Sequence, residues 1–356
     1  MKKIKLSFDA DSHTYTDDEG SVYTSVTQLI GLISPEYDNE FWSMYRALDH
    51  YGHKLRPDLL GRKIWVADAM TGHREYVEYD LATLYSGEIA TYQSPQMITA
   101  EWKDLARIAC DWGNEKHNYL EECIEKFYGK KKVDAPRADV PTLASGDGTF
   151  RYRIVSLEEL ANSPLAETHQ SIYQVLHTLI VKGYTLYAEK RVYSYDHKVS
   201  GTIDVLAVRG REFYIVDWKT NKDELSFEAG YYKKEWNASR TAKEKTKTWV
   251  AKDERFKFPL QSIQFCKGNG YIIQLSLYAY LCELWGLQCK GLILCHIRHK
   301  EVKDNKTGAK TKVDIAPRIY NNLAYWKPEM ATLLQWHLDK NVLKKELAYR
   351  PNGIKV

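Results

Sequence analysis

The sequence predicts an α/β protein, and three observations carry that prediction. Residues 184–218 form three consecutive segments rich in Val, Ile, Tyr and Phe, which is the composition of β-strands. Residues 100–128 follow a strongly helical pattern, and an apolar helix predicted at 272–285 precedes a buried strand at 291–297. Strands and helices therefore alternate through the second half of the chain, as they do in α/β folds.

The first hundred residues begin with a predicted β-hairpin. Residues 4–23 alternate apolar and polar side chains around the turn Asp17-Asp18-Glu19-Gly20. Ser25 or Thr27 is placed to cap the helix that follows. Residues 35–100 mix helical patches with Gly and Pro breaks, and no chemistry can be assigned to them.

The strand region is predicted to be an antiparallel meander. Its strands are expected at residues 184–195, 201–208 and 212–218, separated by the turns Asp196-His197-Lys198 and Arg209-Gly210-Arg211. An exposed excursion at 136–148 and helical residues 156–182 precede these strands. A hairpin around 304–312 and an amphipathic helix complete the chain.

Residues 222–258 are the best candidate for a mobile, DNA-facing insertion. They hold ten Lys or Arg against seven Asp or Glu, interleaved with Tyr231, Tyr232, Trp236 and Trp249. A solvated polar loop fits the same composition, so both interpretations stay open.

The composition limits the classes of protein to which the chain can belong. At 356 residues with 44% hydrophobic residues, the chain can bury one large core or two ordinary ones. The longest apolar runs are too short to span a bilayer, and the first residues lack the apolar run of a signal peptide, so we expect a soluble cytoplasmic protein with no membrane partner. Six scattered cysteines without a CxxC pair indicate reduced core residues, and we expect no iron–sulfur cluster. The net charge of +4 is mild, so a nucleic-acid surface needs a local concentration of Lys and Arg.

The end of the third predicted strand carries the residues best suited to chemistry. Strand alternation places Asp217 and Lys219 on one face and Trp218 on the other. A tight turn after Val208 would bring Asp204 of the preceding strand towards Asp217. Two converging carboxylates can hold Mg²⁺ or Mn²⁺, and a nearby lysine can hold a phosphate or the attacking water. A solvent-facing ion pair at a strand end explains the same Asp-x-Lys pattern and stays open.

Two helical patterns flank this strand pair. Gly113, His117 and Glu121 share one helix face, where the glycine permits close approach and a neutral imidazole can complete a metal shell. Gln274 and Tyr278 lie four positions apart on an otherwise apolar helix, where they can hydrogen-bond the DNA backbone or orient the lysine. The alternative for His117 is a hydrogen-bonded structural histidine. The alternative for Gln274 and Tyr278 is that they are polar residues at the edge of the core.

Taken in order, these motifs resemble the RecB-like branch of the PD-(D/E)XK nucleases. They are Gly113-x3-His117-x3-Glu121, Gly201-x2-Asp204, Asp217-Trp218-Lys219 and Gln274-x3-Tyr278. The opening Tyr23-Thr24-Ser25-Val26-Thr27 is similar to that of phage proteins in this branch, which also includes CRISPR adaptation nucleases and the mitochondrial genome maintenance exonuclease. The resemblance covers residues 1 to about 300.

The resemblance implies a restriction-endonuclease-like core, a mixed central sheet flanked by helices with helical elaborations. We expect a division into residues 1–100 (an N-terminal hairpin and helical elaboration), a nuclease core at 101–300 with the basic insertion 222–258, and a C-terminal hairpin and helix at 301–356; the core motifs do not explain residues 35–100 and 222–258. The resemblance also implies roles for particular residues: Asp204, Asp217, the Trp218 carbonyl and His117 as ligands of one or two Mg²⁺ or Mn²⁺ ions, Lys219 at the nucleophilic water, Gln274 and Tyr278 as the third motif, and Glu189 and Glu121 in support.

The activity implied by the resemblance is metal-dependent hydrolysis of DNA, single-stranded or with a free end, leaving 5′-phosphates. We expect an exonuclease of phage or mobile-element DNA replication or recombination. A nicking or structure-specific endonuclease, a catalytically silent DNA-binding protein of the same fold, and an unrelated α/β protein with chance motifs are the alternatives.

Overall fold

The computed structural model describes residues 4, 6–9, 14–50, 61–67, 73–78, 94–127, 153–154, 156–221, 223–237, 243–303 and 310–348. The chain forms two compact units, one made of Met1–Pro35 with Gly113–Val356 and the other of Glu36–Trp112. Sequence reasoning grouped residues 1–100 apart from the core, whereas residues 1–35 pack with the core unit. The excursion expected at 136–148 lies outside the described residues.

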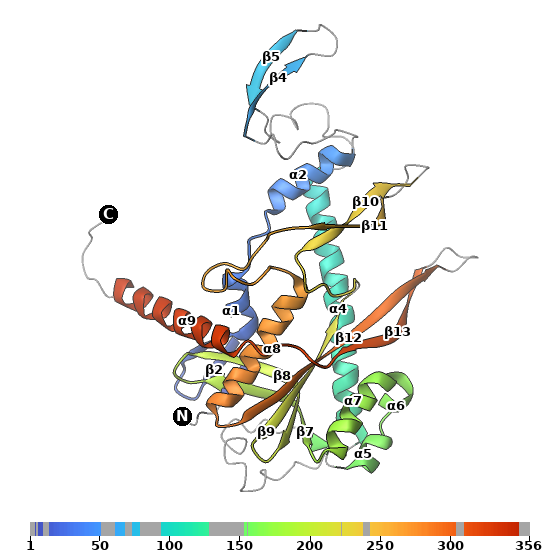
Figure 1. Ribbon diagram of the computed structural model, residues 1–356, viewed down its shortest axis with the longest axis vertical. Coiled ribbons are helices and arrows are strands. Elements are labelled where there is room, and N and C mark those ends of the chain that lie inside the picture. The colour runs from blue at the N-terminus through green and yellow to red at the C-terminus, as the bar shows by residue number, and fades with distance from the viewer. Residues whose placement is uncertain are drawn as a thin grey trace. The chain divides into compact units, whose positions relative to one another are not determined.

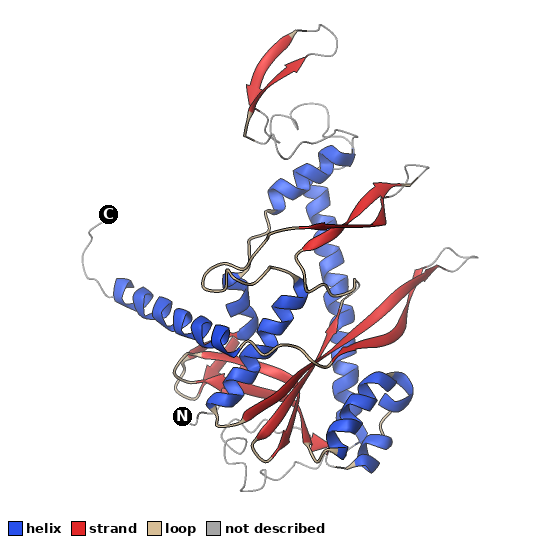
Figure 2. Cartoon of the chain, in the orientation of Figure 1, coloured by secondary structure: helices blue, strands red, loops and turns tan. Residues whose placement is uncertain are grey.

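The predicted α/β class is confirmed, because the larger unit is built on a mixed sheet with helices (Figures 1 and 2). Among the described residues nine strands join this sheet, in the order β1-β2-β3-β8-β9-β12-β13, with β7 also paired to β8 and β6 to β7. Their bounds are β1 Leu6–Asp9, β2 Thr14–Asp17, β3 Val22–Ser25, β6 Arg153–Ile154, β7 Thr185–Ser194, β8 Val199–Arg209, β9 Glu212–Thr220, β12 Gln288–Lys303 and β13 Lys310–Tyr320.

The three predicted central strands form the expected antiparallel meander. β7 pairs with β8 and β8 with β9, each in antiparallel register. The parallel pairings are non-local, because β9 lies beside β12 and β3 lies beside β8. These pairings make the sheet mixed.

Helices cover the sheet of the larger unit. They are α1 Val26–Ile33, α5 Leu157–Ala161, α6 Leu165–Thr168, α7 Gln170–Val181, α8 Lys267–Leu284, α9 Lys327–Ala348 and the part of α4 (Pro95–Phe127) from Gly113 onwards. Figure 2 shows α1 and α8 side by side, and α8 also contacts α9, β7, β9 and β12. Most of α8 is buried from Ile272 to Cys282, as expected for a helix that is apolar on nearly all sides.

Two further hairpins stand outside this sheet. In the larger unit, β10 (Gly230–Trp236) pairs with β11 (Lys243–Ala251). This hairpin lies within residues 222–258, for which a solvated loop was one of the two interpretations from composition. The other unit holds α2 (Asn39–His50), the hairpin of β4 (Lys63–Ala67) and β5 (Arg74–Glu78), and the first part of α4. No helix in the described part of the chain is long and apolar enough to cross a membrane.

The start of α1 follows the predicted capping chemistry. Ser25 rather than Thr27 is the N-cap, and its Oγ accepts a hydrogen bond from Gln28 N at 3.1 Å. Gln28 Oε1 accepts in return from Ser25 N at 2.9 Å, which completes a capping box.

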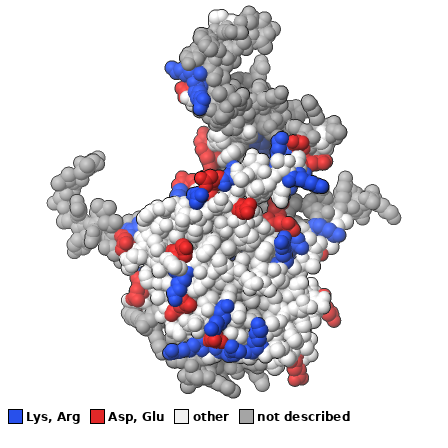
Figure 3. All heavy atoms as spheres, in the orientation of Figure 1, with Lys and Arg blue, Asp and Glu red and all other residues white. Residues whose placement is uncertain are grey.

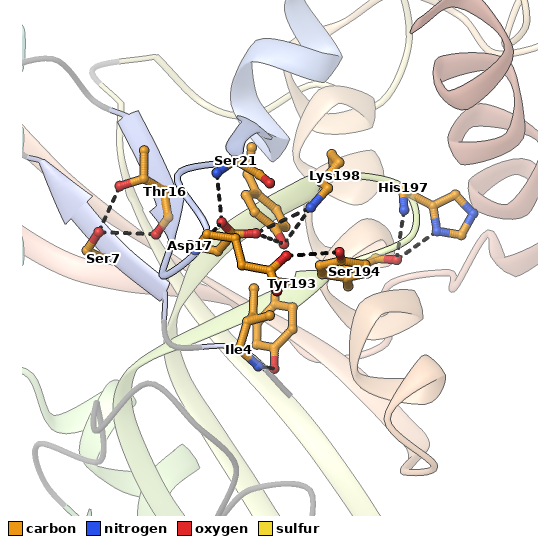
Figure 4. A network of polar contacts seen from close by, with 12 residues as sticks. Ile4, Ser7, Thr16, Asp17, Ser21, Tyr193, Ser194, His197 and Lys198 are labelled. Carbon is orange, nitrogen blue, oxygen red and sulfur yellow. Dashed lines mark hydrogen bonds and ion pairs between the residues drawn. The ribbon is translucent and has the colours of Figure 1, made fainter. Parts of the chain in front are cut away.

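A buried carboxylate ties the N-terminal strands to the turn between β7 and β8 (Figure 4). Asp17 Oδ1 accepts hydrogen bonds from Ser21 N at 2.7 Å and Glu19 N at 3.0 Å. Asp17 Oδ2 accepts from Tyr23 Oη at 3.0 Å and from Lys198 Nζ at 3.3 Å. This network anchors β2 and β3 beside the start of β8, the strand that carries Asp204.

Candidate active site

The end of β9 holds a buried ion pair. Ile215, Val216 and Trp218 are buried, and Asp217 is only 1% exposed. Lys219 Nζ lies 2.7 Å from Asp217 Oδ2. An ion pair between these residues was one of the open interpretations, but it is not on the surface, because the lysine side chain is only 15% exposed. Removing two charges from water is costly, so burial of this ion pair is not explained by the solvent-facing position that the sequence left open.

Asp204 joins this pair through the antiparallel register of β8 and β9. Val205 lies opposite Val216, so the neighbouring positions Asp204 and Asp217 come close together. Asp204 Oδ2 accepts a hydrogen bond from Trp218 N at 2.8 Å. The predicted approach of the two aspartates is therefore present in the structure.

The electrostatics reflect this crowding. Burial, reinforced by the nearby Asp217 carboxylate, raises the pKa of Asp204 well above its usual range, and Lys219 opposes that shift. Burial lowers the pKa of Lys219, but Asp217 and Asp204 outweigh it and raise the pKa overall. The site thus concentrates negative charge that a cation can neutralise.

Glu189 adds a third carboxylate and a strained backbone. It lies in β7 between Ala188 and Lys190, which pair with Val205 and Ile203, so it occupies the position opposite Asp204, where the pairing is interrupted. Its charge also helps to raise the pKa of Asp204. Glu189 has a φ of +47°, in the left-handed region that non-glycine residues rarely adopt. Such strain costs roughly 1–3 kcal/mol and gathers at functional sites.

The helical histidine reaches the same cluster from α4. A Cβ at Gly113 would lie 2.8 Å from Thr220 Oγ1, so glycine permits α4 to approach the end of β9. One turn later, His117 Nδ1 lies 3.9 Å from Asp204 Oδ1. Burial and the nearby Lys219 lower the pKa of His117, which favours the neutral imidazole that metals bind. Glu121 follows one further turn along α4 and is half-buried.

Helix α8 closes the other side of the cluster. Gln274 Nε2 donates to Tyr278 Oη at 3.0 Å, and both side chains are buried. A Cβ at Gly201 would lie 2.5 Å from Tyr278 Cε1, so the glycine that precedes Asp204 by three positions makes room for the ring. Burial and Asp217 raise the pKa of Tyr278, which stays a neutral hydroxyl. Because both side chains are buried, they support the cluster from within instead of lying open to a DNA backbone.

Sequence reasoning missed three residues around Lys219. Lys219 Nζ lies 5.4 Å from the centre of the Tyr271 ring, and Tyr271 Oη donates to Asn221 Oδ1 at 2.8 Å. His296, which pairs with Lys219 across β9 and β12, has Nε2 3.0 Å from the Asn221 carbonyl oxygen. Tyr271 lies three positions before Gln274 on the same face of α8, and that spacing was the available signal. The contacts of Asn221 and His296 depend on a parallel pairing that no local pattern reveals.

The donor set suits a hard divalent cation. Two carboxylates and a neutral imidazole converge beside the main chain of Trp218, and Mg²⁺ is commonly bound by one or two carboxylates together with waters and substrate phosphates. Among the described residues, no group of three or more His, Cys, Asp or Glu side chains is arranged to hold a metal ion by itself. Asp204 and Asp217 provide the one or two carboxylates from which Mg²⁺ is commonly bound.

Comparisons with known proteins add little to this geometry. No family model matches the chain, and no curated protein matches it. A solved structure titled "Crystal structure of SSO0001" is 14% identical, with a TM-score of 0.19, and the match covers 55% of this chain and 69% of that one. A likeness of that extent says nothing about fold or activity.

Proposed function

We propose that this protein is a metal-dependent deoxyribonuclease that degrades DNA from a free end and leaves 5′-phosphates. The observation that carries the proposal is the buried cluster of Asp204, in the middle of β8, with Asp217 and Lys219 near the end of the adjacent strand β9. The order of motifs resembling RecB-like nucleases supports the same activity.

Each residue of the cluster has a role in this proposal. Asp204 and Asp217, with His117 and the Trp218 carbonyl, would hold the cation. When bound, a divalent cation lowers the pKa of water and neutralises charge on a phosphate. The Lys219 ammonium group would hold the scissile phosphate or the attacking water, and its ion pair with Asp217 fixes its position.

Burial supports a catalytic role over a structural one. A buried ion pair is a poor source of stability, because desolvation offsets most of the attraction between the charges. A second buried carboxylate at Asp204 increases the repulsion, and the backbone strain at Glu189 adds a further cost. Clusters of perturbed charges such as this one are typical of active sites.

The test is digestion of end-labelled single-stranded, double-stranded and circular DNA with Mg²⁺, Mn²⁺ or EDTA. Asp217→Asn keeps the shape of the side chain, and Asp339→Asn, an exposed residue of α9, is the matched control. We expect cation-dependent loss of linear DNA that spares circles, is kept in Asp339→Asn and falls by at least about a thousandfold in Asp217→Asn. Cleavage of circles would establish an endonuclease instead. Equal activity in both variants would refute the site.

A further inference from the structure

The hairpin β10–β11 lies between two segments of the chain that supply residues of the candidate active site. It lies in sequence between β9, which carries Asp217 and Lys219, and α8, which carries Gln274 and Tyr278. Its base is closed by a hydrogen bond from Lys252 N to Ala229 O at 2.9 Å. The segment before it is joined to α8, because Gly268 N in the first turn of that helix donates to Ser226 O at 3.0 Å. In the described part of the chain, β10 and β11 pair with each other as a separate two-stranded sheet.

Charge is concentrated on this hairpin. Its two strands contain five lysines and two glutamates, a net charge of +3 in a chain whose total is +4. On the face of the molecule seen in Figure 3, basic and acidic side chains are interspersed. A net charge of +3 over two short strands is a local excess of positive charge, which favours binding to a polyanion.

Strand pairing separates the hairpin into two unlike faces. Tyr232 pairs with Trp249, and Lys234 pairs with Lys245 beyond a shift in register. Tyr232 and Lys234 are two positions apart on β10, and Lys245 and Trp249 are four apart on β11, so strand alternation places all four on one face. The two glutamates, Glu235 and Glu244, pair with each other on the opposite face. Lys245 also forms an ion pair with Asp223 at 2.7 Å, at an exposed position.

Of the two aromatic residues on this face, Tyr232 is exposed and Trp249 is half-buried. Tyr232 is 47% exposed, and its ring centre lies 5.0 Å from that of Trp249 in an edge-to-face arrangement. An aromatic pair beside two lysines offers a flat surface for a base next to cations for its phosphates. Bases of a duplex are already stacked and paired, so this combination suits an unpaired strand.

We infer that the face of the hairpin formed by Tyr232, Trp249, Lys234 and Lys245 binds single-stranded nucleic acid. The inference rests on the proposed function, since the bound strand would be the one that enters the cluster at Asp217. Binding itself needs neither a metal ion nor cleavage, so it can be measured separately.

The test is fluorescence anisotropy of a short labelled oligothymidylate with the full chain in EDTA, over a range of salt concentrations. We expect Tyr232→Leu to weaken binding about tenfold and Tyr232→Phe to leave it unchanged, because phenylalanine keeps the stacking surface. We expect Lys234→Gln to reduce the slope of log affinity against log salt by about 0.7, while Lys182→Gln, an exposed lysine beyond the end of α7, keeps the slope.

The outcomes separate this inference from the proposed function. Unchanged oligonucleotide affinity in Tyr232→Leu and Lys234→Gln would overturn the inference, even if Asp217-dependent cleavage is observed. Tighter binding of a matched duplex than of the single strand would overturn it as well. Loss of binding in these two variants without cleavage by the wild-type chain would support the hairpin and refute the nuclease. A melting temperature equal to that of wild type shows that Tyr232→Leu acts on binding and not on folding.

Discussion

Replacing Asp17 with asparagine tests how much a single buried carboxylate stabilises the larger unit. The side chain is fully buried and accepts four hydrogen bonds, two of them from Tyr23 and Lys198. Asp17→Asn keeps the shape but removes the negative charge, and its amide nitrogen cannot accept hydrogen bonds. The link between the N-terminal strands and the β7–β8 turn is then weakened.

The pKa of Asp17 gives the size of the effect. Burial opposes ionisation, but hydrogen bonds from Ser21, Tyr23 and Lys198 outweigh it and lower the pKa from 3.8 to about 2. Since a tenfold change in an acid constant is about 1.4 kcal/mol, this shift stabilises the folded state by about 2 kcal/mol. Because the folded-state pKa is the lower one, the stabilisation is complete above pH 3.8 and is lost as the pH falls to about 2.

Urea unfolding followed by tryptophan fluorescence at pH 7, 5, 4 and 3 measures this effect. At pH 7 we expect Asp17→Asn to unfold at a lower urea concentration than wild type, with a free energy of unfolding about 2 kcal/mol smaller. This difference in free energy should shrink below pH 4. Asp18→Asn changes the same net charge at an exposed position of the same turn, and we expect it to stay within about 0.5 kcal/mol of wild type. Equal unfolding midpoints for the two variants at pH 7 would refute the reasoning.

Substitutions at Gly201, Gly113 and Glu189 probe the geometry of the site. Gly201→Ala places a methyl group against the Tyr278 ring, so we expect a loss of about 1–3 kcal/mol in urea unfolding and weaker DNA hydrolysis, and unchanged values for both would contradict the contact. Gly113→Ala should lower activity by pushing α4 away from Thr220, and the double variant Gly113→Ala/Thr220→Ala should recover it, whereas simple additivity of the two changes would argue against the clash. Glu189→Gly relieves the left-handed backbone, so we expect stability to rise by about 1 kcal/mol while hydrolysis falls. Glu189→Gln keeps the strain and should lose activity without gaining stability.

The local parts of the fold could be predicted from sequence. The meander β7–β8–β9 was readable because each strand pairs with its neighbour in sequence, so alternation and turn residues determine the register. That register is enough to bring Asp204 to Asp217. Capping of α1 by Ser25 or Thr27 was readable for the same reason, since the partners of the cap lie within three positions, and the structure selects Ser25.

The rest depended on tertiary contacts. The parallel pairing of β9 with β12 leaves no local signal, so the proximity of His296 to Lys219 could not be foreseen. The hairpin β10–β11 resembled a loop because polar side chains occupy both faces of its strands, which removes the apolar alternation that marks a half-buried strand. The left-handed conformation of Glu189 is imposed by its surroundings, since no propensity of glutamate predicts it.

The link between Asp17 and Lys198 also has a consequence for biosynthesis. The two residues are 181 positions apart, and β3 finds its parallel partner only in β8. At ribosomal rates of about 5–20 residues per second, the nascent N-terminal strands wait on the order of ten seconds or more for that partner. During this interval they form at most a small antiparallel sheet with an open edge, which is a marginal structure and a template for association with other chains. Capture of these first strands by β8 is therefore a step at which chaperones can act during synthesis.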